Sequence, residues 1–156
     1  MWPFKKHESF APLPPVVLTE EERQECQAFI RSFTNTDQGD WVVPNEFADS
    51  IQRNFISMCL MGRAQRFVIL SHEKPEYVTR ACDAAAKACA IFPVSKTFYE
   101  FGCVLEDVGK QADSKQMFGE FLRRCEIEKP DKVMAIALRQ FDMESAVVHA
   151  REVINS

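Results

Sequence analysis

Glycine is scarce in this sequence, with five residues among 156, and runs that alternate β-branched and polar side chains are lacking. Strands are therefore poorly supported. Alanine, glutamate, lysine, arginine and glutamine are abundant, and these residues favour helices because they lose little freedom there. The length suits about one domain, and the ordinary globular composition excludes a disordered or collagen-like chain. We expect an all-α fold.

A surplus of positive charge and long hydrophobic runs are lacking too. The net charge is −4 and the basic residues form pairs rather than clusters, which argues against nucleic acid as a partner. The longest uncharged apolar stretches, residues 54–62 and 88–95, are less than half of the ~20 residues that span a bilayer. Prolines and a carboxylate interrupt the N-terminus where a signal peptide needs an apolar core. We expect a cytoplasmic chain that does not bind membranes.

Signatures of catalysis and metal binding are missing as well. The sequence has no glycine-rich nucleotide loop, and no Cys or His pair has the short spacing of a structural zinc site. Cys82 and Cys89 lie seven apart, and we interpret the six cysteines as reduced core thiols. A cysteine nucleophile would need His7, His72 or His149 as its base, so a cysteine-dependent enzyme stays a third alternative. We expect no cofactor, no metal and no enzymatic activity.

Residues 1–18 have the composition of an N-terminal arm rather than of a core element. Four prolines block a helix there, and they stand among aromatic residues that include Trp2 and Phe4. Exposed aromatic side chains are costly unless something covers them. We therefore expect Trp2 and Phe4 to contact a partner, which could be the protein's own body, a second copy or a different protein.

Residues 19–156 read as one helical domain. Thr19 and Glu22 have the spacing of a capping box, Ser95 is a candidate N-cap, and Gly109 suits the left-handed position after a helix. Gly62 leaves open whether the segment 45–70 is one helix or two. The periodicity predicts about seven helices in antiparallel pairs, over residues 20–33, 44–70, 75–92, 97–108, 112–127, 131–138 and 143–154.

A spacing of 33 residues relates two segments of the chain. The second helices of two expected pairs share small and apolar residues at this period: Ala81, Ala85 and Ala88 in one, Ser114, Phe118 and Phe121 in the other. Periods of this length are typical of helical repeats, in which each unit packs on the next. An unrelated helical bundle with coincidental spacing is the alternative.

Residues 95–128 resemble one tetratricopeptide repeat. The spacing of that family's first helix and of the turn glycine after it is matched by Phe98, the pair Phe101-Gly102, Leu105 and Gly109. The spacing of its second helix is matched by Ser114, Phe118 and Phe121. The resemblance extends in weaker form over residues 62–154. It departs from the family at Ile69, which replaces the small glycine, and at Pro130, which is displaced.

The resemblance implies a concave groove that receives a peptide. The groove positions of the family fall on Lys96, Tyr99, Cys103 and Glu106, with Arg63 and Arg66 contributed by the preceding helix. Such a groove would favour an acidic or C-terminal ligand, although these residues could equally be ordinary surface charges. We expect a protein-binding adaptor or assembly subunit. The alternative is a structural subunit of a larger homo- or hetero-oligomer, latched to its neighbour by the arm.

Overall fold

A computed structural model describes residues 16–34, 50–128, 135, 138–139 and 141–156. These residues form helices and no strand, which confirms the all-α class. The helices are α1 (Glu20–Thr34), α2 (Ser50–Ser71), α3 (Tyr77–Ile91), α4 (Ser95–Asp107), α5 (Gln111–Ile127) and α7 (Met143–Asn155). Residues 1–15 of the expected arm and most of the expected helix over 131–138 lie outside the described residues.

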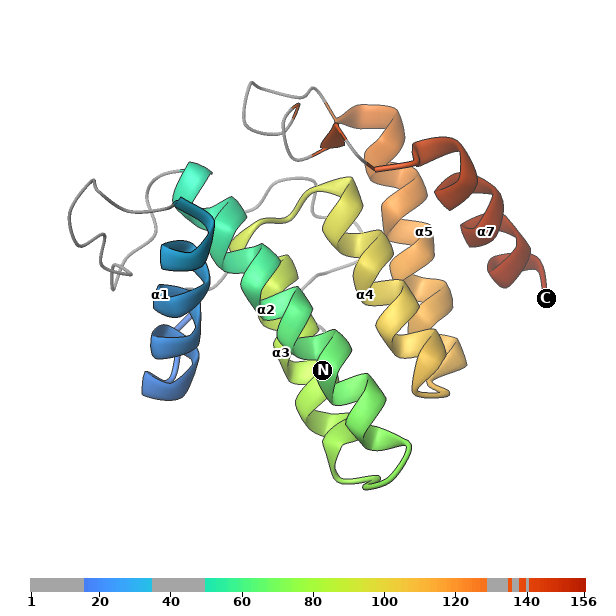
Figure 1. Cartoon of the computed structure of the whole chain (residues 1–156). Coiled ribbons are helices and arrows are strands. Elements are labelled where there is room, and N and C mark those ends of the chain that lie inside the picture. The colour runs from blue at the N-terminus through green and yellow to red at the C-terminus, as the bar shows by residue number, and fades with distance from the viewer. Residues whose placement is uncertain (1–15, 35–49, 129–134, 136–137, 140) are drawn as a thin grey trace.

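The helices stand in a row of antiparallel pairs (Figure 1). Short turns join α2 to α3 and α4 to α5, and each of these pairs is packed along its length. Helix α1 packs on α2 at one end of the row, and α7 packs on α5 at the other (Figure 1). No described helix combines the length and the apolar character needed to cross a bilayer.

Helix starts and ends follow from local hydrogen bonds. The Thr19 amide donates to Glu22 Oε1 at 2.8 Å and the Glu22 amide donates to Thr19 Oγ1 at 3.2 Å, so the predicted capping box is confirmed. Helix α2 runs unbroken through Gly62, which settles that the segment from Ser50 onward is one helix. Gly109, which follows the C-cap residue Val108 of α4, has a φ of 82°, as predicted for the left-handed position after this helix.

The expectation that Ser95 caps α4 is wrong. Val94 is the N-cap residue, and its amide donates to the Thr97 hydroxyl at 3.2 Å. Ser95 is instead the first helical residue, and both its amide and its hydroxyl donate to the Glu128 carboxylate, at 2.8 and 2.9 Å. The cap is thus replaced by a carboxylate from the end of α5, a tertiary partner that local sequence does not reveal.

Candidate functional site

The positions matched to the tetratricopeptide motif make tight contacts between α4 and α5. The residues placed at its large apolar and small positions are at most 1% exposed: Phe98, Phe101, Leu105, Phe118 and Phe121 among the large ones, and Ser114 among the small ones. The Ser114 hydroxyl donates to the Gly102 carbonyl at 3.0 Å. A Cβ on Gly102 would lie only 2.6 Å from the Phe118 ring, so the absence of a side chain lets the two helices approach.

The helix pair α2 and α3 shares only part of the packing seen between α4 and α5. Ala81, Ala85 and Ala88 of α3 are fully buried, as are their counterparts 33 residues later. Ile69, which stands where the motif has its small glycine, is 69% exposed and so does not repeat the role of Gly102. The repeated packing is therefore carried by the second helices of the two pairs.

The predicted groove residues Arg63 and Arg66 lie against α1. Arg63 is 8% exposed and pairs with both Glu25 and Glu21, the latter at 3.0 Å. Arg66 also pairs with Glu25, and Arg80 of α3 lies 3.8 Å from Glu21. This Arg/Glu network sets three guanidinium groups against two carboxylates and so leaves one positive charge in excess.

Aromatic rings extend the network. The rings of Phe67 and Tyr77 stack with centroids 5.6 Å apart. The Arg80 guanidinium lies 4.6 Å from the centroid of Phe67, and that of Arg63 lies 4.9 Å from it. Cation–π contacts at these distances hold guanidinium groups in fixed positions. The contacts of Phe67 thus add to the ion pairs of Arg63 and Arg80.

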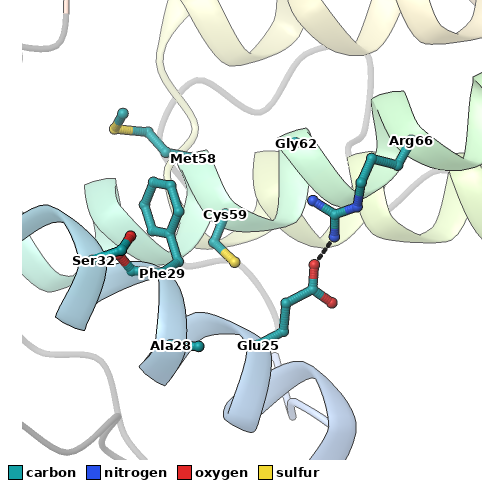
Figure 2. A pocket seen from close by; sticks show the side chains of 8 residues that line it. All are labelled: Glu25, Ala28, Phe29, Ser32, Met58, Cys59, Gly62 and Arg66. Atoms are coloured by element: carbon teal, nitrogen blue, oxygen red, sulfur yellow. Dashed lines mark hydrogen bonds and ion pairs between the residues drawn. The ribbon is translucent and has the colours of Figure 1, made fainter.

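A pocket of about 300 Å³ opens beside the network, between α1 and α2 (Figure 2). Its lining consists of Glu25, Ala28, Phe29 and Ser32 from α1 and of Met58, Cys59, Gly62 and Arg66 from α2. Phe29 and Met58 stand side by side at one end, and the ion pair of Glu25 with Arg66 closes the other (Figure 2). Met58 is 37% exposed although it is apolar. The pocket thus pairs an apolar end with a charged end.

Of the predicted groove residues of α4, Tyr99 and Glu106 meet α7. His149 bridges two of them, with Nδ1 2.8 Å from the Tyr99 hydroxyl and Nε2 2.9 Å from Glu106 Oε1. Because a carboxylate can only accept, Nε2 donates to Glu106. Burial raises the pKa of the neighbouring Cys103 thiol to about 11 and so keeps it protonated, which is not the state of a nucleophile. Lys96 pairs with Glu100 of its own helix at 3.6 Å.

The structure therefore divides the expected groove between two ends of the row. It brings Tyr99, Cys103 and Glu106 together, but it places Arg63 and Arg66 with partners on a different helix. Trp2 and Phe4 lie outside the described residues. Sequence reasoning missed Glu21 and Glu25 as partners, named His149 only as a candidate base for a cysteine, and missed Phe29 and Met58 as pocket residues. The sequence signal for these contacts is spacing alone: Glu21 and Glu25 lie four apart, and Arg63 and Arg66 lie three apart, so each pair forms a charged stripe on one helix face.

Within the described part of the chain, no group of three His, Cys, Asp or Glu residues could hold a metal ion. Comparison with models of known families gives no match. No curated protein and no solved structure matches this chain either.

Proposed function

We propose that this chain is a non-enzymatic protein–protein interaction module, an adaptor or assembly subunit built from tetratricopeptide-like helix pairs. The supporting observation is the close approach of α4 and α5 at Gly102, where the Phe118 ring fills the space of the missing side chain. Stacked helix pairs of this kind present surfaces to partners rather than enclosing a reaction centre. We expect residues 131–138 to supply the seventh helix, and a cytoplasmic setting.

The binding surface that the geometry favours is the pocket between α1 and α2. Its apolar end offers Phe29 and Met58 to an apolar side chain, which would replace water there. Its charged end offers Arg66, whose side chain is 59% exposed and belongs to a network with one excess positive charge. The fitting partner is a protein segment that carries an apolar anchor next to an acidic group.

Capture of partners from an extract of the source cells, with quantitative mass spectrometry, tests the proposal. The bait variant Met58→Asp/Arg66→Glu places like charge in the pocket and should lose the captured partner at least tenfold. Substituting Arg63 or Tyr99 would not separate lost binding from a disturbed fold, because both side chains are packed and paired within the protein. Arg151→Glu makes the same arginine-to-glutamate exchange at an exposed position on α7; it controls for the charge reversal and should capture as the unaltered chain does.

Equal capture by the pocket variant and the control would contradict this binding surface. If neither the unaltered chain nor the control enriches any protein, the proposal of an interaction module fails. Circular dichroism on each bait verifies that its helices are intact.

A second candidate function is that of a structural subunit whose arm latches a neighbouring chain. Val17, at the junction between the arm and α1, is 80% exposed although it is apolar. An exposed apolar side chain at the end of a sequence segment that is rich in aromatic residues favours a contact outside the protein's own core. Light scattering on the full chain and on a chain lacking residues 1–15 tests this. A latch predicts that the larger species disappears on deletion.

A further inference from the structure

Two cysteines face each other between α1 and α2. Cys26 is fully buried, Cys59 is 5% exposed, and the two side chains interact directly. The ion pair between Glu25 and Arg63 lies next to them, because Glu25 precedes Cys26 and Arg63 follows Cys59 by about one helical turn. The helices are thus held in register where the thiols meet.

Only one of the two thiols borders open space. Cys59 belongs to the lining of the pocket of about 300 Å³, and its sulfur points from α2 toward α1 (Figure 2). Cys26 is absent from that lining and is fully buried in the core. Cys89 makes a useful contrast, because it is also fully buried but donates to the Thr97 carbonyl at 3.1 Å rather than meeting another thiol. A small oxidant therefore reaches Cys59 first.

The charge and hydrogen bonding around the two thiols also favour oxidation of Cys59 before Cys26. The hydrogen bond from Cys26 lowers the pKa of Cys59, against the effect of burial, and the positive charge of Arg63 acts in the same direction. The same hydrogen bond, together with burial, raises the pKa of Cys26. The thiolate is the reactive form toward oxidants, so the more accessible sulfur is also the better nucleophile.

We propose that Cys59 and Cys26 form a reversible, peroxide-sensitive disulfide that joins α1 to α2. The Cys59 thiolate attacks hydrogen peroxide, the O–O bond breaks, and Cys59 becomes a sulfenic acid, while the departing hydroxide takes up the proton that Cys59 released on ionising and leaves as water. The Cys26 sulfur then attacks the Cys59 sulfur, the S–O bond breaks, and the departing hydroxyl takes up the thiol proton of Cys26 and leaves as a second water. Two thiols are oxidised and one peroxide is reduced to two waters.

The bond would act on the helix that forms one end of the row. Helix α1 packs mainly against α2, so a covalent link between these two helices fixes α1 to the rest of the protein. The disulfide would also hold the Cys59 wall of the pocket toward α1. The proposal rests on the thiol pair and holds whether or not the pocket binds a partner.

Peroxide treatment of the full chain, followed by alkylation and mass spectrometry, tests the proposal. We expect the loss of two hydrogen masses, a peptide pair linked through Cys26 and Cys59, and full reversal by dithiothreitol. Cys59→Ser should abolish the link. Cys26→Ser should leave a sulfenic acid on Cys59, which dimedone traps. Cys82→Ser removes a partly exposed cysteine elsewhere and should leave the link unchanged.

Two results would overturn the proposal. One is that both thiols stay alkylatable at peroxide concentrations that oxidise an added small thiol. The other is that the disulfide joins a different pair, or that Cys59 passes to the sulfinic acid without linking to Cys26. Circular dichroism of the two Ser variants shows whether they are folded. If one is not, disulfide mapping in the unaltered chain and in Cys82→Ser still decides the matter.

Discussion

Replacing Gly102 by alanine should destabilise the protein, although alanine favours helices. A Cβ at this position would lie 2.6 and 2.7 Å from two atoms of the Phe118 ring. That ring is fully buried and also packs against Tyr99 and His149, with centroids 5.5 and 5.2 Å away, so it cannot move aside freely. Overpacking of this kind costs about 1–3 kcal/mol, while the gain in helix propensity is only ~1 kcal/mol.

Gly119→Ala is the matched control, because it makes the same exchange one residue after Phe118. A Cβ on Gly119 meets nothing within 4 Å, so this variant should gain up to ~1 kcal/mol. The propensity term is common to both variants, and the difference between them isolates the strain at about 1–3 kcal/mol. Urea unfolding followed by circular dichroism measures both. If Gly102→Ala is as stable as Gly119→Ala, the inferred approach of α4 to α5 is wrong.

Three further predictions concern helix ends and buried charge. Gly109→Ala should lose about 1–2 kcal/mol in urea unfolding, since its φ of 82° is left-handed and the space around it is open; an equally stable variant would refute the backbone argument. Glu22 has a lowered pKa, because hydrogen bonds from Lys87 and Thr19 outweigh its burial. The stabilisation that Glu22 provides is therefore present above the pKa of Glu22 in the unfolded chain, and it is lost as the pH falls through its pKa in the folded protein. Glu22→Gln should therefore make the free energy of unfolding less dependent on pH between roughly pH 5 and 3. Arg124→Met removes a guanidinium that donates to the Pro93 carbonyl at 2.6 Å and lies 4.4 Å from the centroid of Phe98, and should cost about 2 kcal/mol by thermal unfolding.

Local sequence was sufficient to predict most of the helices. The capping box of Thr19 and Glu22 fixed the start of α1, and Gly109 marked the end of α4, because both signals act within one turn of the backbone they satisfy. Ser95 failed as a cap because Glu128, 33 residues away, binds its amide. The cap then depends on how α5 ends beside α4, which no local pattern encodes.

The candidate site was less predictable, because its contacts join distant parts of the chain. Arg63 meets Glu25 across 38 residues, and Tyr99 meets His149 across 50. Which of two charged stripes faces the other depends on the packing of the helices that carry them. The family resemblance placed Arg63 and Tyr99 in one groove, whereas Arg63 pairs with Glu25 of α1 and Tyr99 contacts His149 of α7. Helices α1 and α7 lie at opposite ends of the row (Figure 1).

Photo-crosslinking from two apolar positions on α2 tests the proposed binding surface most directly. A photoreactive amino acid would replace Met58, which lines the pocket, or Ile69, which is 69% exposed and absent from the pocket lining. The proposal predicts that light links a protein partner to position 58 and not to position 69. No adduct at position 58, or adducts of equal yield at both positions, would contradict it.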